Sequence, residues 1–421
     1  QPVVAPGYDD WFATRDPTTY SMYNYVVQDG AIRRPFGELP QDYQTDVLTD
    51  RAVQDIRAWA PQDQPFFIHY STSAPHHELY DAETGPRAAP RHEGTFAGRT
   101  FDPRPNYNEE DVSDKPSVVR HYARIDSALG NKIATNRTDR LEALQAVDEG
   151  VARMVSELKA AGELDNTLLI FTSDNGYLHG EHRLPNQKVV HYEESTRVPL
   201  IVRGPGFPAG ETRKQLVGNI DLAPTIVQLA GATPGRVMDG ESLVRYAEDP
   251  GYRRNRSLVL ESDFAEVGGT TQLIIPPYHQ GVHVYYDAIR TKRFKYVHWF
   301  RDVNGEEVDE YELYDLAADP FEMDSLHESP RHASIRKALA KELRTFKDCA
   351  GRDCRRRVRV RPPCLDDVSA LRIGAERRDL LLEAGSPRRL NDRVWRYCVE
   401  GGPAARAVFS RAGVVRRVFR N

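Results

Sequence analysis

The fold is decided by the stretch TLLIFTSDNG, residues 167–176. Its first six residues form a short apolar run typical of a buried strand, and its last four are typical of a turn. The preceding residues, Leu141 to Leu158, carry apolar side chains at helical spacing, and Gly162 follows them as a stop signal. A helix that leads into a buried strand is the repeating unit of α/β domains, so this stretch predicts one.

The same unit recurs on both sides of this stretch. Residues 45–59 have the periodicity of an amphipathic helix, and residues 65–70 (PFFIHY) follow as a buried strand. Residues 199–203 (PLIVR) predict another strand, and Asp221 is placed as the N-cap of the helix LAPTIVQLAG. This alternation predicts an α/β domain over residues 1–255, with a mostly parallel sheet sandwiched by helices.

From Ser257 onward the pattern changes to short strands. The segments SLVLES, YDAIRTKRFKYVHWF and EYELYDL predict an antiparallel sheet, and residues 334–346 predict a helix beside it. We assign these elements to a smaller α+β subdomain, residues 256–347. The remaining residues, 348–421, alternate turn residues with short apolar runs and predict an Arg-rich β appendage that contains the cysteines.

Composition limits the classes of function. The 421 residues include 62 acidic and 57 basic side chains, for a formal net charge of −5, so overall charge gives no argument for nucleic-acid binding. No apolar run is long enough to span a bilayer. Residues 352–361 and 388–420 are rich in arginine, and we prefer a solvated surface there to a polyanion site. Residues 81–115 lack periodicity and predict a long surface loop beside the functional site.

All four cysteines lie in the last fifth of the chain. Their even number predicts two disulfides and an oxidising compartment, so we expect a secreted or extracytoplasmic protein, although no signal peptide is visible at Gln1. A zinc site is the alternative, but neither a C-x-x-C spacing nor a neighbouring histidine supports it. Of the three pairings that four cysteines allow, adjacent spacing favours Cys349–Cys354 and Cys364–Cys398.

Asp174 and Asn175 come directly after the predicted strand 167–172. The carboxyl ends of sheet strands are where open α/β domains bind ligands. Carboxylate and amide oxygens are hard donors that suit Ca²⁺ or Mg²⁺ better than zinc. Taken alone, however, the sequence SDNG is more simply explained as a turn.

Further motifs accompany this pair in a specific order. The segments PFFIHYSTSAPHHE, NIDLAPTIVQLAG, TKRFKYV and ELYDLAADPFE flank it along the chain. After Asp174-Asn175-Gly176 come Gly180-Glu181-His182, Lys188, Tyr192-Glu193 and Arg197-Val198-Pro199. These motifs resemble the sulfatase family of the alkaline-phosphatase superfamily over roughly residues 1–326, and are most similar to its branch of arylsulfatases and N-acetylglucosamine-6-sulfatases. The resemblance implies an alkaline-phosphatase-like fold and a hydrolase that converts an aryl or sugar sulfate to alcohol plus inorganic sulfate.

The resemblance also implies roles for individual residues. Asp174 and Asn175 would be two ligands of Ca²⁺, or of Mg²⁺. Lys188 would hold an oxygen of the sulfate group, and His76 would contact the same group as a catalytic residue. This set fits the chemistry, because the charge of a sulfate monoester must be neutralised by a cation and a lysine.

Two histidines compete for contact with the leaving group, which a positioned acid must protonate. His179 and His182 both follow the Asp174-Asn175 turn, and we favour His182. His77, beside His76, has no counterpart in the family pattern.

The nucleophile of the family is absent from these 421 residues. The family uses a formylglycine made from Cys, or from Ser, in a C-x-P-S-R-type motif, whereas the four cysteines here are followed by AGRD, RRRV, LDDV and VEGG. The family's N-terminal Asp-Asp metal ligands are absent too. We therefore expect this chain to be an inactive fragment, without its N-terminal part, of an active secreted sulfatase that acts on a sulfated small molecule or glycan.

Two other functions remain open. A phosphodiesterase or phosphonate monoester hydrolase of the same superfamily would share the fold and metal site, but such relatives commonly carry Asp-His in place of Asp174-Asn175. A non-catalytic protein that binds sulfated glycans would keep the pocket and lack the nucleophile. The sequence names neither the substrate nor the oligomeric state, and we interpret Arg87, Arg91 and Arg104 of the long loop as ordinary surface residues.

Overall fold

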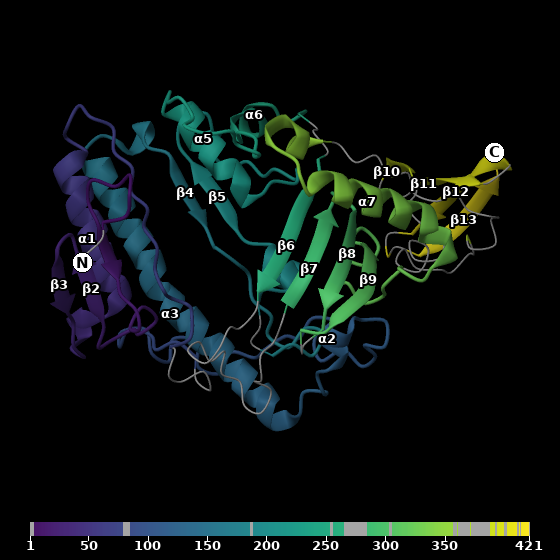
Figure 1. Cartoon of the computed structure of the whole chain (residues 1–421), viewed down its shortest axis with the longest axis horizontal. Helices are drawn as coiled ribbons and strands as arrows, with labels where there is room; N and C mark the ends of the chain where they lie inside the picture. Colours follow the sequence, from purple (N-terminus) through teal and green to yellow (C-terminus); the bar gives the residue numbers. More distant parts are fainter. Residues whose placement is uncertain are drawn as a thin grey trace.

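The structure is a computed structural model of the chain. Figure 1 shows the N-terminal helices at one end, the C-terminal strands at the other, and a sheet covered by a helix between them. The described residues are 4–78, 85–185, 188–252, 256–264, 284–302, 305–356, 360, 371, 388–391, 394–399, 402–410, 412 and 414–420.

Two predicted helices pack side by side in the N-terminal part (Figure 1). They are α1, Gln44–Trp59, and α3, Ser127–Ala160. The carboxylate of Asp126 caps α3 by accepting a hydrogen bond from the backbone of its first turn at 2.8 Å. At Gly150 the two helices lie so close that an added Cβ would be 2.6 Å from Thr49 Oγ1. Glycine at this position therefore permits the close packing that the two apolar faces require.

Short elements surround this helix pair. A small antiparallel sheet that the sequence did not predict comprises β1, Phe12–Thr14, β2, Val26–Asp29, and β3, Ile32–Pro35. The described residues of the predicted loop, 85–115, contain no helix or strand, and α2, Ser117–Arg120, follows them.

Within the stretch TLLIFTSDNG, residues 167–176, the strand β4, Leu169–Thr172, pairs antiparallel with β5, Leu200–Arg203. All strand pairs of the described residues are antiparallel, so the parallel pairing that we expected is not seen in that part of the chain. Phe171 is 39% exposed and Ile201 is 63% exposed. The prediction of a buried strand at residues 167–172 is therefore wrong in its burial, because no described element covers Phe171, whereas the strand predicted at residues 199–203 is present as β5.

The predicted strand at residues 65–70 is not a strand in the structure. Its side chains nevertheless alternate in exposure. Phe66 and Ile68 pack against a buried cluster around Ile56 of α1, whereas Phe67 is 58% exposed. The sequence pattern therefore predicted the alternation in exposure correctly. A strand also needs backbone hydrogen bonds to a neighbouring strand, and within the described residues the segment has no such partner strand.

The predicted antiparallel sheet is present, with its strands in sequence order. Leu339 of the last helix shares a buried cluster with Phe294 and Leu313 of the sheet, so the helix covers one face (Figure 1). The elements are β6, Leu258–Phe264, β7, Val284–Arg290, β8, Phe294–Arg301, β9, Glu307–Asp315, and α7, Ala333–Phe346.

The tail forms a second four-stranded antiparallel sheet, as its pattern of short apolar runs predicted. Trp395 and Phe409 pack in its own buried cluster, with ring centres 4.5 Å apart. Its strands are β10, Arg388–Asn391, β11, Val394–Val399, β12, Gly402–Phe409, and β13, Val415–Arg420.

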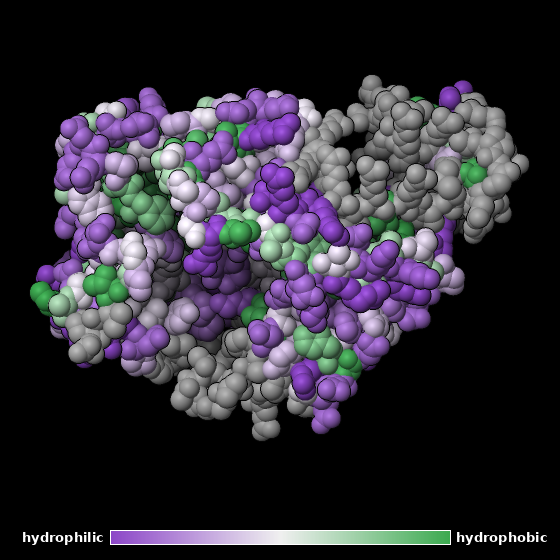
Figure 2. All heavy atoms as spheres, turned by 45° about the horizontal axis from the view of Figure 1, so that its top comes forward, coloured by the Kyte–Doolittle hydropathy of each residue, from purple (hydrophilic) through white to green (hydrophobic). Residues whose placement is uncertain are grey.

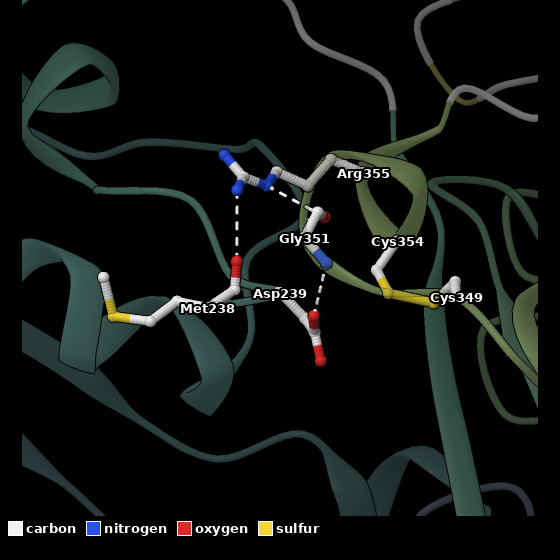
Figure 3. The surroundings of a disulfide bond; sticks show 6 residues. All are labelled: Met238, Asp239, Cys349, Gly351, Cys354 and Arg355. Atoms are coloured by element: carbon white, nitrogen blue, oxygen red, sulfur yellow. Dashed lines mark hydrogen bonds between the residues drawn. A yellow bond between two sulfur atoms is a disulfide. The ribbon is translucent and has the colours of Figure 1, made fainter. Parts of the chain in front are cut away.

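Cys349 and Cys354 form a disulfide, which is one of the two predicted pairs (Figure 3). For the other predicted pair, Cys364 and the side chain of Cys398 lie outside the described residues. The observed disulfide closes a short turn that precedes the strands of the tail, so it does not itself link those strands.

The disulfide-bonded turn attaches to a distant loop (Figure 3). Gly351 N donates to Asp239 Oδ1 at 2.7 Å, and Arg355 Nη2 donates to Met238 O at 3.1 Å. The turn therefore connects the start of the tail to the α/β part of the chain.

Asp221 directly precedes α5, as predicted, but its carboxylate does not cap the helix. It accepts from Gly218 N at 2.8 Å and pairs with the buried Arg256. The remaining helices are α4, Glu193–Thr196, α5, Leu222–Leu229, and α6, Val244–Glu248.

The surface is mixed. Among the described helices, none has the length and apolar character needed to cross a membrane. On the face in Figure 2, hydrophobic residues form separate patches within a mostly hydrophilic surface, and a hollow lined mainly by hydrophilic residues lies near the middle of the view.

Candidate active site

The turn after β4 holds the two predicted metal ligands. Asn175 N donates to Asp174 Oδ1 at 2.9 Å, and Ser173 Oγ donates to Asn175 O at 2.8 Å. Gly176 N donates to Ser195 O at 2.7 Å, which ties the turn to α4. An added Cβ at Gly176 would overlap a backbone oxygen of α4, so glycine is required there. The side chain of Asp174 is exposed and therefore accessible to a ligand.

The donors of this turn fit part of a Ca²⁺ site. Asn175 Nδ2 donates to Gly176 O at 2.7 Å, so the amide oxygen is the atom that can bind a cation next to the Asp174 carboxylate. Ca²⁺ takes about six to eight oxygen ligands. The described residues contain no group of three or more His, Cys, Asp or Glu side chains that could hold a metal. The pair therefore supplies two suitable donors and needs further ligands to hold an ion.

His76 and His77 lie in a loop that packs against Tyr20. The ring centres of His76 and Tyr20 are 4.3 Å apart, as are those of His76 and His77. His76 Nδ1 lies 2.8 Å from His77 O and donates to it, which leaves Nε2 as an acceptor in the neutral ring. Burial lowers the pKa of His76 to about 4 and that of His77 to about 3.

Lys188 shares an electrostatic environment with these histidines. Its charge and that of Arg140 add to burial in lowering the pKa of His76, whereas Asp174 opposes the shift. Burial also lowers the pKa of Lys188, against the attraction of Asp174. The structure thus brings Asp174, Lys188 and His76 together, although they are far apart in the sequence.

Stability should depend on pH through His76. Its pKa of about 4 in the folded chain lies below the ordinary value of 6.5. Between pH 6.5 and about 4 the unfolded chain therefore binds a proton that the folded chain does not, so this contribution to stability should be lost as the pH falls. Unfolding by urea at several pH values should show a shallower acid loss in His76→Gln than in wild type. Equal slopes, together with an NMR titration of His76 at an ordinary pKa, would contradict its burial.

One residue of this site was not predicted from the sequence: Arg140 of α3. It is 9% exposed, and its Nη1 donates to Pro75 O at 2.8 Å, next to His76. Its guanidinium carbon lies 3.8 Å from the ring centre of Tyr177. A signal was present, because Arg140 falls one turn before Ala143 in the buried stripe of α3, where an arginine needs a special environment.

His179 lies beside Arg140. The rings of His179 and Tyr177 are 5.2 Å apart, and Tyr177 is the ring on which Arg140 stacks. Burial lowers the pKa of His179 to about 3, and the charge of Arg140 adds to this shift. His179 Nδ1 is buried without a hydrogen-bond partner among the described residues. A ligand could therefore satisfy this nitrogen.

His182 does not join this site. It is fully buried, and its ring stacks on Tyr192 with centres 4.0 Å apart. Its Nδ1 lies 2.6 Å from Glu109 Oε2, and its Nε2 lies 3.2 Å from Asn106 Nδ2. Since both ring nitrogens face protein groups, this geometry does not fit the leaving-group contact that the sequence favoured for His182.

The segment after Lys188 is anchored to the second sheet through Glu312 of β9. This side chain is fully buried. Burial alone would raise its pKa, but His191 and the hydrogen-bond donors around it outweigh that effect and lower the pKa to about 2. The donors are His191 Nε2 at 2.6 Å, Tyr192 OH at 2.9 Å, Trp299 Nε1 at 2.7 Å and Tyr314 OH.

Lys295 of β8 adds a second anchor. Its Nζ donates to His191 O at 2.7 Å and lies 3.0 Å from Glu193 and 2.7 Å from Glu322. Lys295 and Glu322 are fully buried. The second sheet therefore holds the backbone that directly follows Lys188, and this anchor restricts the position of the Lys188 backbone.

The arginine side chains of the long loop are themselves about half exposed, and each pairs with a less exposed carboxylate, of which Glu194 is nearly buried. Pairs that involve an exposed arginine contribute little to stability when the carboxylate is solvated too, about 0–1 kcal/mol each. This arrangement agrees with the surface interpretation that we preferred. The pairs are Arg87–Glu78 at 2.7 Å, Arg91–Asp46 at 2.7 Å and Arg104–Glu194 at 3.2 Å.

Comparison with known proteins identifies the class to which this fold and site belong. The family model described as Sulfatase matches residues 4–232, and the one described as N-sulphoglucosamine sulphohydrolase, C-terminal, matches residues 180–348. The chain therefore belongs to the sulfatase family, which confirms the resemblance seen in its motifs.

Curated relatives include two sulfatases that match most of the chain. It is 34% identical over 394 residues to an arylsulfatase of Volvox carteri, which covers 83% of this chain and 58% of that protein. It is 30% identical over 368 residues to an N-acetylglucosamine-6-sulfatase of Bos taurus, covering 84% and 63%. A putative extracellular sulfatase Sulf-1 homolog of Caenorhabditis elegans is 34% identical over 253 residues, covering 57% and 33%. The chain thus spans about three fifths of the length of the first two relatives.

Solved structures confirm the alkaline-phosphatase-like fold. One is a protein in complex with its substrate D-glucosamine-2-N,6-O-disulfate, with a TM-score of 0.65 and 24% identity, covering 81% of this chain and 76% of that chain. Another is the phosphonate monoester hydrolase of Agrobacterium radiobacter, with a TM-score of 0.55 and 22% identity, covering 74% and 62%. At these identities the likeness concerns the fold alone.

Proposed function

We propose that this protein is one of the sulfuric ester hydrolases, which convert a sulfate monoester to an alcohol and inorganic sulfate. The observation that carries the proposal is that the charges of Asp174 and Lys188 act on each other and on the His76 ring, although the three residues are far apart in the sequence. Membership of the sulfatase family and the names of the curated relatives support it. The substrate class would be a sulfated small molecule or a sulfated glycan.

The proposed roles follow from the geometry of each group. Asp174 and Asn175 would help to hold Ca²⁺, or Mg²⁺, which when bound neutralises charge on the sulfate oxygens. Lys188 binds a further sulfate oxygen. The sulfate charge favours the protonated form of His76, and its Nε2–H then donates to the sulfate because Nδ1 is held by His77 O.

We assign contact with the leaving group to His179 rather than His182. His179 lies beside Arg140 and has a buried nitrogen without a partner among the described residues, whereas His182 is fully buried against Glu109. The N–H of the neutral His179 ring would donate a hydrogen bond to the leaving-group oxygen and so stabilise the charge that develops there as the sulfur–oxygen bond breaks.

The nucleophile that we propose is a formylglycine, which sulfatases generally use. The 421 residues contain no motif for it. An extracytoplasmic location is supported by the Cys349–Cys354 disulfide and by similarity to a protein named as an extracellular sulfatase homolog.

The test is turnover by the polypeptide that the complete gene encodes, assayed with Ca²⁺ against 4-nitrophenyl sulfate, N-acetylglucosamine 6-sulfate and 4-nitrophenyl phosphate. We expect the sulfate esters to be hydrolysed faster than the phosphate ester, and the 421-residue chain alone to hydrolyse neither. Preference for phosphate or phosphonate esters would support the phosphonate hydrolase alternative. Binding of a sulfated glycan without turnover would support a binding protein.

A further inference from the structure

Arg140 is a buried cation without a carboxylate partner among the described residues. It is 9% exposed, and it lies on α3 between the loop that carries His76 and the loop that carries His179. Two of its neighbours are uncharged at neutral pH: Pro75 O accepts from Nη1 at 2.8 Å, and the Tyr177 ring lies 3.8 Å from the guanidinium carbon. Its Nε is buried and has no hydrogen-bond partner there.

This arrangement is energetically costly for the protein alone. A guanidinium stays protonated in proteins, so it cannot escape burial by losing its proton. Burial lowers the pKa of Arg140, which shows that its surroundings disfavour the charge. A buried ion without a partner is strongly disfavoured, whereas a stacked guanidinium with a free N–H is well prepared to bind an oxyanion.

The charge of Arg140 points to a distinct part of the site. The charges of Arg140 and Lys188 both lower the pKa of His76 and of His77. The pKa of His179 is also lowered by Arg140, but there the other contributing charges are Arg137 and Arg104 and not Lys188. Since Arg140 donates to Pro75 O beside His76 and stacks on Tyr177 beside His179, it lies between the proposed sulfate end and the proposed leaving-group end. The sulfate end already has Lys188 and the metal-ligand pair to act on the ester sulfate, so Arg140 is available to a second anionic group of the same substrate.

We infer that Arg140 binds an oxyanion on the leaving group, so that the site selects sulfate esters whose alcohol carries a second acidic group, a sulfate or a carboxylate. This inference rests on the proposed sulfatase function. Arg140 acts here as a substrate-binding residue that determines specificity, and the bond that breaks is unchanged.

The kinetic test compares two sugars that differ by one anionic group. Wild type and Arg140→Gln, each as the polypeptide of the complete gene, are assayed with glucosamine 6-O-sulfate and glucosamine 2-N,6-O-disulfate. We expect the substitution to raise KM for the disulfate about tenfold or more, the loss typical of a charge-assisted hydrogen bond, and to change KM for the monosulfate about twofold or less. Equal changes for both sugars would overturn the inference.

A binding measurement separates this inference from the proposed function. Glucosamine 2-N-sulfate and glucuronate, which carry an acidic group but no ester sulfate, are titrated calorimetrically into both proteins. Tighter binding of either one to wild type than to Arg140→Gln supports the inference even if no ester is hydrolysed, and the stronger of the two identifies sulfate or carboxylate. Equal binding to both proteins refutes it even if sulfate esters are hydrolysed.

Two further variants separate binding from folding. Arg140→Lys keeps the charge and the packing of the stem, and it should retain part of the preference for the disulfate. Arg153→Lys, on the exposed side of the same helix and paired with Asp50 at 2.6 Å, is the matched control and should leave both KM values unchanged. If Arg140 were only structural, Arg140→Gln would lower thermal stability and affect both sugars alike.

Discussion

Replacing Glu312 by alanine is expected to lower the free energy of unfolding by about 3–5 kcal/mol, the combined cost of a cavity and of buried hydrogen-bond donors left without an acceptor. The carboxylate accepts from four buried donors on three segments, and alanine would leave His191, Tyr192 and Trp299 without that acceptor. It would also open a cavity between the sheet and the segment that follows Lys188. Urea unfolding monitored by tryptophan fluorescence measures the loss.

The controls for this prediction lie on the same strand. Glu307 is exposed on β9, so Glu307→Ala should change the free energy of unfolding by about 0.5 kcal/mol or less. Glu312→Gln keeps the volume and an acceptor oxygen, and should be destabilised less than Glu312→Ala. If Glu312→Ala were as stable as Glu307→Ala, the buried network would not be an anchor.

Replacing Lys188 by alanine is expected to lower kcat by about 10²–10³-fold in the enzyme of the complete gene, as for other groups that stabilise charge in a transition state. The reason is that Lys188 provides a cation beside His76 and Asp174, where the proposed sulfate binds. Steady-state kinetics with 4-nitrophenyl sulfate measure the effect.

Lys159, in the exposed last turn of α3, provides the control for this variant. Lys159→Ala should retain wild-type kinetics, and Lys188→Ala should retain wild-type thermal stability because Lys188 itself is not among the buried anchors. Unchanged kcat in Lys188→Ala would show that this lysine does not contact the reacting group.

The local elements were predictable because they depend on neighbouring residues. The apolar stripes of α1, α3 and α7 repeat within a few turns, and the alternation in β6 to β9 repeats within single strands. The Asp174-Asn175 turn was predictable for the same reason. Periodicity does not report which strand lies beside which, so the antiparallel pairing of β4 with β5 could not be read from it.

The features that were missed depend on residues far apart in the sequence. Arg140 belongs to the site only because α3 brings its side chain into contact with Pro75 and Tyr177. His182 looked like a candidate beside His179, but the fold turns it toward Glu109 and Tyr192. A motif therefore identified the segment correctly, whereas the direction of each histidine required the packed structure.

The exposed side chains on β4 and β5 have a practical consequence for handling this polypeptide. Phe171 and Ile201 face each other across a two-stranded ladder and are open to water. Apolar strands with unpaired edges are adhesive, because another strand can add to them. Concentrated solutions of these 421 residues are therefore expected to aggregate through this patch unless another polypeptide covers it. Solubility would then depend on this exposed pair of side chains more than on the net charge of −5.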